Sequence, residues 1–212
     1  MKQSILLILA MFIFTACSTK EKSVEYNKPA VYWYNKMLKQ IATASIDEAD
    51  DTFTSLESEH KNSPLLPSAL MIIANAHMDE EEYVMATYYF DEYLKKFSTA
   101  TNIDYVRYLK VKAKFMGFKY QFREQELVYD TINDANYFIE SYPDSEYIYL
   151  VKDIKSRLNM AKASFDKEVS ELYTRVGKDK ASEVYEQRTK QSWQDMKNTS
   201  DVEVPWYRAI FE

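Results

Sequence analysis

Few residues in this sequence have the chemistry of an active site. Its 212 residues include one cysteine, Cys17, and two histidines, His60 and His77. No His-Glu-x-x-His pair is present to bind a metal, and no serine lies between glycines as in a hydrolase nucleophile turn. The acidic run at residues 79–82 leads into an apolar helical pattern, where carboxylates offset the helix dipole. We therefore expect two structural histidines, no metal site, and a protein that is not an enzyme.

Cys17 closes an apolar N-terminal segment. Residues 5–14 form an unbroken apolar run, too short to cross a bilayer as a helix but typical of a signal peptide. The residues that follow, Thr15-Ala16-Cys17, resemble a bacterial lipobox, although Phe14 occupies a position where Leu, Val or Ile is usual. We predict cleavage before Cys17 and lipidation of that residue, which would anchor the chain with about 0.8 kcal/mol per buried methylene. The alternative is an ordinary signal peptide cleaved after Ala16, with Cys17 left as a free thiol.

The expected boundaries divide the chain into four parts. Residues 1–16 form the lipoprotein signal peptide, residues 17–29 a polar, flexible tether that carries the lipid, residues 30–190 a helical superhelix, and residues 191–212 a C-terminal extension with an aromatic tail. Removing the signal peptide takes away Lys2 and changes the formal net charge from −6 to −7. An acidic chain argues against nucleic acid as the partner, because neutralising phosphates requires a basic face. Apart from the covalent lipid, we expect no cofactor.

Composition indicates an all-α fold. Gly117 and Gly177 are the only glycines, whereas tight β-hairpins and phosphate-binding loops are built from glycine. Apolar residues recur at helical spacing, and the aromatic content of 15% suits tetratricopeptide-like repeats, in which tyrosine and phenylalanine separate neighbouring helices. We expect an all-α, tetratricopeptide-like helical-repeat superhelix of about four to five helix pairs.

One apolar pattern occurs three times, with offsets of 37 and then 45 positions. The copies are Ile46, Ala49, Phe53 and Leu56; Tyr83, Ala86, Phe90 and Tyr93; and Val128, Thr131, Ala135 and Phe138. The pattern resembles the second helix of a tetratricopeptide repeat, where a small residue lets two helices approach and an aromatic residue fills the groove to the next unit. Because both offsets exceed the usual period of about 34 residues, we expect longer connections at residues 62–67 and 98–102.

The first helices of the repeats supply the predicted binding groove. In a tetratricopeptide superhelix these helices line the concave face, where an extended peptide meets a rigid surface. Five residues occupy the groove positions of the first two units and are our candidate peptide-binding residues: Tyr34, Leu38, Met71, Asn75 and Met78. Methionine and tyrosine at these positions suit a varied apolar and aromatic ligand. The alternative is that these side chains only line the superhelix and face water.

Two further helices are predicted beyond the third repeat copy. Residues 103–117 form one, which Gly117 ends. Residues 147–173 form the long helix of the fourth repeat, about 40 Å at 1.5 Å per residue. Its apolar stripe consists of Val151, Ile154, Leu158, Ala161, Phe165 and Leu172. We expect this stripe to face the core of the superhelix, with a coiled-coil partner as the alternative. Gly177 then leads into a partner helix that contains Ala181 and Tyr185.

The order of these features resembles that of one protein family. The sequence motifs that carry the resemblance are Tyr142-Pro143-Asp144-Ser145-Glu146-Tyr147, Arg157-Leu158, Val169-Ser170-Glu171-Leu172-Tyr173, and Gly177 with Ala181. Together with the lipoprotein leader they are similar to the BamD (ComL) lipoproteins of the outer-membrane β-barrel assembly machinery, over most of residues 31–188. The chain departs from that family where Tyr185 replaces an arginine, with Arg188 three positions later, and where residues 60–63 replace Tyr-Pro-x-Ser.

The resemblance implies a lipid-anchored scaffold on the periplasmic face of the outer membrane. The groove would receive the C-terminal aromatic signal of unfolded outer-membrane barrel proteins, and the C-terminal repeats would dock the periplasmic domains of the barrel-forming subunit. The implied partners are therefore that subunit, unfolded barrel proteins, and the membrane through the lipid anchor. The alternative is a tetratricopeptide lipoprotein that scaffolds peptidoglycan enzymes or cell-division proteins of the envelope.

The chain ends in an aromatic tail. Pro205 stops any preceding helix, and Trp206, Tyr207 and Phe211 are residue types favoured as interface anchors. Together with Arg188, these three aromatic residues are the candidate partner-docking residues. Two interpretations remain open: the tail packs back onto the last repeat as a cap, or it docks on a partner.

Overall fold

The protein is described by a computed structural model that places residues 25–97, 101–118 and 125–196. These residues form eight α-helices and no strand. The helices are α2 (Ala30–Ala42), α3 (Ile46–Glu59), α4 (Leu66–Asp79), α5 (Tyr83–Lys96), α6 (Ile103–Gly117), α7 (Gln125–Ser141), α8 (Ile148–Arg175) and α9 (Asp179–Met196).

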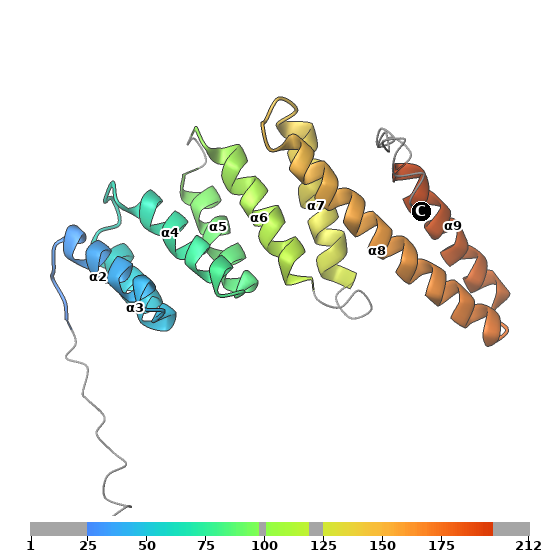
Figure 1. Ribbon diagram of the computed structural model, residues 1–212, viewed down its shortest axis with the longest axis horizontal. Helices are drawn as coiled ribbons and strands as arrows, with labels where there is room; N and C mark the ends of the chain where they lie inside the picture. The colour runs from blue at the N-terminus through green and yellow to red at the C-terminus, as the bar shows by residue number, and fades with distance from the viewer. Residues whose placement is uncertain (1–24, 98–100, 119–124, 197–212) are drawn as a thin grey trace, which may run out of the picture.

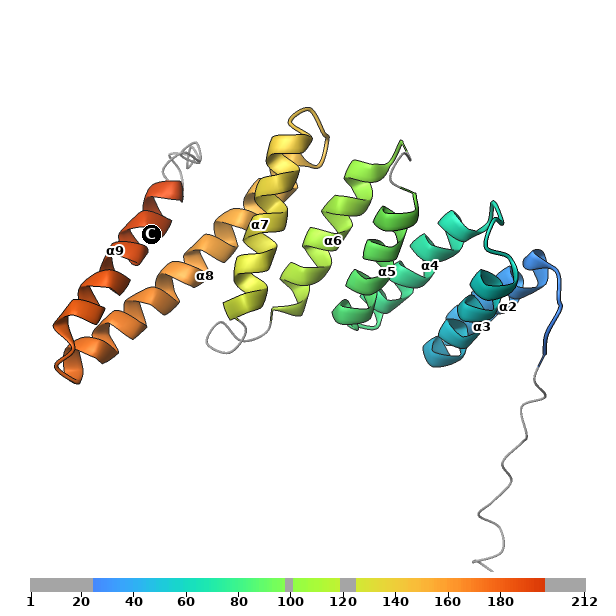
Figure 2. The same ribbon diagram turned by 180° about the vertical axis from the view of Figure 1, so that it is seen from behind.

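Each helix packs on the next along the chain, and the repeat pattern groups the helices as four pairs, α2/α3, α4/α5, α6/α7 and α8/α9. The pairs stand side by side in an elongated array, with α2 and α3 at one end and α8 and α9 at the other (Figures 1 and 2). This arrangement confirms the all-α, tetratricopeptide-like superhelix. Among the described residues, none of the helices is both long and apolar enough to cross a membrane.

The repeat register expected from the sequence is confirmed. Ala49, Ala86 and Thr131, the small residues of the three copies, are all fully or almost fully buried. The second helices of the first three pairs also end in the same way, with a backbone N–H that donates to the carbonyl oxygen four residues earlier. These hydrogen bonds join His60 to Leu56 at 3.0 Å, Phe97 to Tyr93 at 2.8 Å, and Tyr142 to Phe138 at 2.9 Å.

The connections between pairs also repeat. Ser63 follows α3 and Ser145 follows α7, and each hydroxyl oxygen accepts a hydrogen bond from the backbone N–H two residues later. Each serine also accepts, through its carbonyl oxygen, the N–H three residues later, that of Leu66 or Ile148. The first repeat therefore makes the same turn as the third although its sequence departs from Tyr-Pro-x-Ser, because the serine supplies the hydrogen bonds of this turn.

The turns inside three of the pairs require a left-handed backbone. Ala44 lies between α2 and α3 with φ 53°, Glu81 between α4 and α5 with φ 61°, and Gly177 between α8 and α9 with φ 71°. Glycine adopts this conformation at no steric cost, whereas a residue with a Cβ atom is strained there by about 1 kcal/mol. Two of the three turns therefore carry strain that the third avoids.

The buried side chains form two clusters. The first spans α2 to α6 and is centred on Trp33, Leu70 and Phe90, and the second spans α6 to α8 and is centred on Phe138 and Leu158. Among the described residues, α9 contributes to neither cluster. The last helix pair is therefore held together in a different way from the others.

The packing of α9 corrects the expected stripe on the long helix. Val151, Ile154 and Leu158 are buried as expected, but Leu172, at the far end of the stripe, is about half exposed. The buried face of this half of α8 is polar or small instead, and its members are Asn159, Ala163, Asp166 and Ser170. The prediction is therefore confirmed for the first three residues of the stripe, Ala161 and Phe165 are partly buried, and the prediction is wrong at Leu172 because α9 packs on the polar face. Helix α9 also runs to Met196, past the superhelix boundary expected at residue 190.

Candidate binding surfaces

His77 is the buried centre of an ion cluster that joins the first two helix pairs. Its side chain is 1% exposed and lies between two carboxylates, with Nδ1 2.6 Å from Glu82 Oε2 and Nε2 2.9 Å from Asp50 Oδ1. Tyr89 donates from its hydroxyl to the same Asp50 oxygen at 2.7 Å, and its ring stacks on the imidazole with 5.3 Å between centroids. Since both nitrogens face carboxylates, both must carry hydrogen, and the geometry is that of an imidazolium ion.

The pKa of His77 follows from this geometry. Burial alone would lower the pKa, but the hydrogen bonds to Asp50 and Glu82, together with their charges, outweigh burial and raise it above its usual 6.5. Glu82 belongs to the acidic run at residues 79–82 that was expected to serve a helix entry. It does precede α5, but its carboxylate makes no capping hydrogen bond and binds His77 instead. The cluster is therefore structural. Within residues 25–97, 101–118 and 125–196, no group of His, Cys, Asp or Glu is arranged to hold a metal ion.

The five groove candidates lie on α2 and α4, which contact each other. Tyr34, Leu38 and Met71 are partly buried and pack against the first core cluster, which leaves part of each side chain open to a ligand. Asn75 turns its amide back on its own helix, where Nδ2 donates to the Met71 carbonyl oxygen at 2.6 Å. Met78 is only 9% exposed and belongs to the core cluster, so it presents little surface.

An aromatic cluster further along the superhelix was not among the sequence candidates. Tyr108 and Tyr147 stack with 5.1 Å between centroids and 6° between planes, and Tyr105 lies 5.1 Å from Tyr147. All three are partly exposed, and burial raises the pKa of Tyr108 and of Tyr147. The i, i+3 spacing of Tyr105 and Tyr108 was visible in the sequence. Their ring contacts with Tyr147, which directly precedes α8, could not be predicted from the spacing of residues along the sequence.

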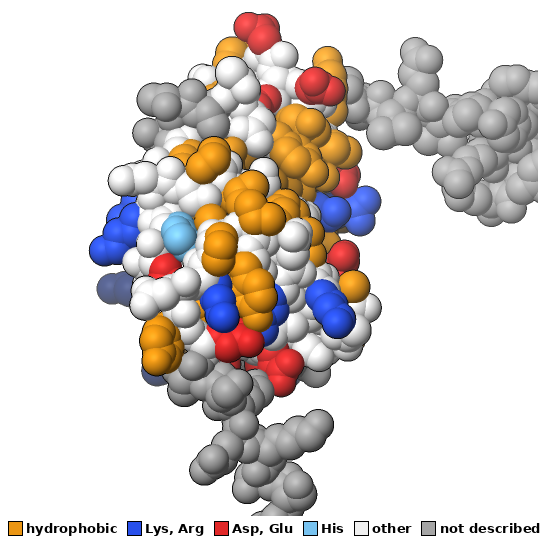
Figure 3. Space-filling view, turned by 90° about the vertical axis from the view of Figure 1, so that its left-hand side faces the viewer, with side chains coloured by type: hydrophobic (Ala, Val, Ile, Leu, Met, Phe, Trp, Pro, Cys, Tyr) orange, Lys and Arg blue, Asp and Glu red, His pale blue; other side chains and the backbone are white. Residues whose placement is uncertain are grey.

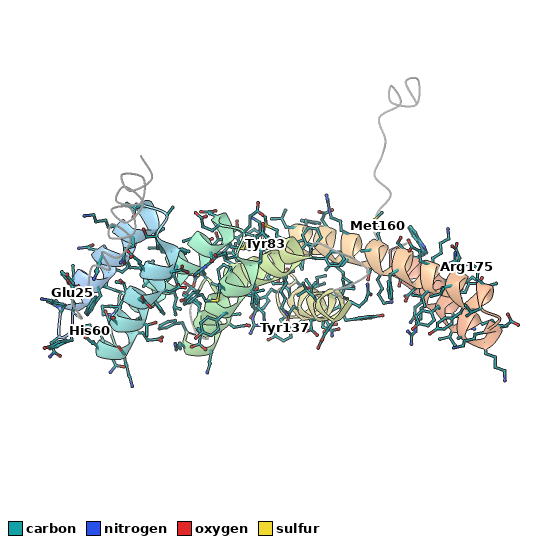
Figure 4. The ribbon with its side chains drawn as sticks, turned by 90° about the horizontal axis from the view of Figure 1, so that it is seen from below. Glu25, His60, Tyr83, Tyr137, Met160 and Arg175 are labelled. Atoms are coloured by element: carbon teal, nitrogen blue, oxygen red, sulfur yellow. The ribbon has the colours of Figure 1, made fainter. Side chains whose placement is uncertain are left out.

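The interface between α8 and α9 is polar. Lys162 donates from Nζ to Ser192 at 2.9 Å and lies 3.6 Å from Asp166, while Ser170 exchanges hydrogen bonds with Ser182. Asp166 is fully buried, neither of its oxygens has a hydrogen-bond partner, and burial raises the pKa of this carboxyl. The half-exposed Met160 and the exposed Arg175 lie on α8 within this pair (Figure 4).

Arg188, the candidate docking residue on α9, is exposed, and its guanidinium carbon lies 4.8 Å from the centre of the Tyr185 ring. The tyrosine that replaces the expected arginine therefore supports the arginine one turn later. The remaining candidates, Cys17, Trp206, Tyr207 and Phe211, lie outside the described residues, as does the expected division of residues 1–24.

At the N-terminal end of the superhelix, side chains at the end of α3 hold the residues that lead into α2. Glu59, the last residue of α3, accepts hydrogen bonds from the Asn27 backbone N–H at 3.0 Å and from Trp33 Nε1 at 2.8 Å. The Nε2 atom of His60 lies 2.7 Å from the Lys28 carbonyl oxygen. Figure 4 shows Glu25 and His60 together at this end of the superhelix. Sequence reasoning missed this contact, because its partners lie about thirty residues apart.

The stacked helix pairs define a helical-repeat protein. Comparison with known proteins identifies the family. The family model described as outer membrane lipoprotein, YfiO, matches residues 26–202. The outer membrane protein assembly factor BamD of Helicobacter pylori is 35% identical over 201 residues, covering 94% of this chain and 91% of that protein. The chain belongs to the BamD (YfiO) family of outer membrane lipoproteins, which confirms the resemblance found in the sequence.

Two solved structures are also similar to this chain. MamA from residue 41 to its end, from Desulfovibrio magneticus RS-1, has a TM-score of 0.43 and 12% identity. A MamA RS-1 double mutant has a TM-score of 0.40 and 13% identity. In each case the similarity covers 84% of this chain and all of the other.

Proposed function

We propose that this protein is a lipid-anchored scaffold on the periplasmic face of the outer membrane that assists the assembly of β-barrel proteins. The family match supports the general role, since the H. pylori relative is named an outer membrane protein assembly factor. In this proposal the protein has two binding partners. The groove of the N-terminal repeats binds unfolded barrel proteins, and the C-terminal helix pair binds the barrel-forming subunit.

The observation that carries the docking proposal is the apolar stripe left open on α8. Val169 and Leu172 line an open hollow on this helix together with Glu168, Glu171 and Arg175. Leu172 is about half exposed and Val176, the residue directly after α8, is exposed, because α9 covers the polar face of the helix. A contiguous exposed apolar stripe rimmed by charged residues is typical of a protein interface.

Copurification tests the docking proposal. Leu172→Asp places a charge between Val169 and Val176 without removing a buried group, so the isolated protein should fold normally. We expect membranes expressing this variant to yield much less of the barrel-forming subunit with the tagged protein. Val84→Asp is the matched control, because Val84 is 84% exposed on α5, far from the stripe. Normal recovery with the Leu172 variant, or recovery of a murein hydrolase in place of the barrel subunit, would refute the proposal.

The groove proposal rests on the partly exposed Tyr34, Leu38 and Met71 and on the tyrosine cluster that follows them. A photoreactive benzoylphenylalanine in place of Met71 should crosslink to a peptide that carries the C-terminal aromatic signal of a barrel protein. The same group in place of Val84 should not. Equal crosslinking at both positions would indicate non-specific contact and would contradict a groove.

The anchor proposal rests on Cys17. Cys17→Ala should abolish lipidation and leave the protein unprocessed or released from the membrane fraction. No helix among the described residues is long and apolar enough to cross a bilayer in its place. Fractionation with and without the barrel-forming subunit separates direct anchoring from attachment through a partner. Tight membrane association of the alanine variant in the absence of that partner would contradict lipid anchoring.

A further inference from the structure

The N-terminal end of the superhelix carries an exposed apolar surface. This end face consists of Tyr26, Lys28, Val31 and Tyr32, with Tyr26 68% and Val31 58% exposed. Figure 3 looks onto this end of the molecule and shows hydrophobic side chains gathered there, with both basic and acidic side chains beside them. The terminal repeats of a solenoid normally present a polar outer face to solvent. The exposed apolar surface of the end face therefore indicates that another molecule or a membrane binds there.

We propose that the end face rests on the surface of a phospholipid bilayer, an inference that rests on the proposed lipid anchor at Cys17. The chemistry of the face suits the membrane interface. Tyrosine is favoured there because its ring is apolar and its hydroxyl is polar, and lysine reaches the headgroups while its stem covers apolar surface. Lys28 lies with Nζ 5.6 Å from the centre of the Tyr32 ring, so the charge and the aromatic ring are presented together.

The large apolar side chains exposed on α2 lie at the end nearest the anchor. The exposed residues of this helix lie on one side, beginning with Val31 and Tyr32, continuing with Asn35 and Lys39, and ending with Ala42. The first two are large and apolar or aromatic, the next two are polar, and the last offers only a methyl group. A protein partner lying along the whole helix would be expected to meet apolar side chains along its length. A bilayer met by one end of the helix requires them at that end alone.

The distance to the anchor limits how far the end face can lie from the bilayer. Seven residues separate Cys17 from Glu25, and even a fully extended chain spans at most about 29 Å between these two residues. The next residues cannot lengthen this connection without losing hydrogen bonds. Glu25 accepts from the Tyr32 hydroxyl at 2.9 Å and from Lys36 Nζ at 2.6 Å, and Glu59 and His60 hold the backbone of Asn27 and Lys28.

The anchor also decides between possible occupants. A second copy of the chain or a partner protein would have to compete with a bilayer that the lipid keeps close at all times. Lys28 favours the bilayer further, since a basic side chain near an anionic lipid surface contributes about 1 kcal/mol, and the Glu25 carboxylate beside Tyr32 is already paired with Lys36. The bilayer is therefore the occupant that the charge and the position of the end face favour.

Depth-dependent fluorescence quenching tests the proposal. The mature chain, beginning at Cys17, is coupled through that thiol to a maleimide phospholipid in vesicles of phosphatidylethanolamine and phosphatidylglycerol. Val31→Trp places a fluorophore in the end face, and Val84→Trp, at another exposed valine, is the matched control. The three native tryptophans are common to both variants, so the added signal is the variant minus the parent. Brominated lipids should quench the signal of Val31→Trp roughly twofold, because an interfacial side chain lies about 5–10 Å into the headgroup boundary. The control should be unaffected.

Three results would overturn the proposal. If neither variant is quenched by brominated lipid and iodide quenches both equally, the body of the protein stands away from the bilayer. If Val31→Trp is shielded from iodide in concentrated solution without vesicles, a second copy covers the end face. If it is shielded only when the barrel-forming subunit is added, a protein partner covers it. Should Val31→Trp fail to fold, as judged by circular dichroism, Tyr26→Trp takes its place. Because the lipid is attached chemically, a negative result leaves the assembly function and the cellular lipidation of Cys17 untouched.

Discussion

Replacing His77 with glutamine should destabilise the protein, and by an amount that depends on pH. In the native fold the imidazolium donates to Asp50 at 2.9 Å and to Glu82 at 2.6 Å. The glutamine side chain can donate to one of these two carboxylates, but it carries no positive charge. Each hydrogen bond to a charged group contributes about 1.5–3 kcal/mol, but Asp50 retains the Tyr89 hydroxyl and the Glu82 side chain is partly exposed. We therefore expect a loss of about 2 kcal/mol in the free energy of unfolding near pH 6.

The direction of the pH dependence follows from the raised pKa of His77. A histidine that holds its proton more tightly in the folded state stabilises that state fully below its usual pKa of 6.5. This stabilisation is lost as the pH rises through the folded-state pKa, at about 1.4 kcal/mol for each unit by which the pKa is raised. The difference between parent and variant should therefore be largest near pH 6 and should shrink toward pH 9.

Urea unfolding followed by circular dichroism measures this difference. Parent and His77→Gln are compared at about pH 6 and about pH 9, so that other titrating groups contribute equally to both proteins. His60→Gln is the control, since His60 lies at the exposed N-terminal end and bonds a single carbonyl oxygen. A His77 difference that is the same at both pH values would show that the buried ring is neutral, and the ion cluster would then be wrong.

Three further predictions concern packing, turns and a buried charge. Ala86→Leu should lower the free energy of unfolding by about 1–3 kcal/mol through overpacking, and Phe90→Ala by about 3–5 kcal/mol through lost burial and a cavity; parent-like urea midpoints for both would refute the helix contact. Ala44→Gly should raise the free energy of unfolding and Gly177→Ala should lower it, each by about 1 kcal/mol, because both positions require a left-handed backbone; shifts of the thermal midpoint in the same direction for both variants would contradict the turn geometry. Asp166→Asn should raise the free energy of unfolding by about 1 kcal/mol near pH 8 and by less near pH 5, because burial raises the pKa of this carboxyl and destabilises its ionised form; a loss of stability in urea melts would show that its charge is needed by Lys162.

The parts of the fold that could be predicted are those set by apolar spacing. Ala49 and Phe53 identified a close helix contact and its neighbouring groove, and the offset to Ala86 and Phe90 gave the register of the next pair. Helix α6 ends at Gly117 as expected, because the helix pattern and the glycine agree. In each of these cases one local signal specified one local structure.

The parts that could not be predicted depend on polar contacts between distant residues. Helix α9 packs on the face of α8 that carries Asp166 and Ser170, a choice that hydrophobic periodicity cannot anticipate because its specificity comes from hydrogen bonds. The partners of His77 include Asp50, on the helix before it, and nothing in the spacing marks that carboxylate. The groove candidates were assigned by repeat position, and that assignment did not foresee that Met78 would be buried.

The long helix also has a mechanical consequence. Helix α8 is clamped by the second core cluster as far as Leu158, and beyond that residue it packs on α9, with Tyr129 of α7 beside Lys162. The part from Leu158 to Arg175 is about 25 Å long at 1.5 Å per residue. A bend of about 10° at the clamp would move its tip by about 4 Å, and helices bend gently with little loss of hydrogen bonding. We therefore expect that a partner pulling on the tip of the last helix pair would bend α8 and turn it against α7. No repeat would need to unfold.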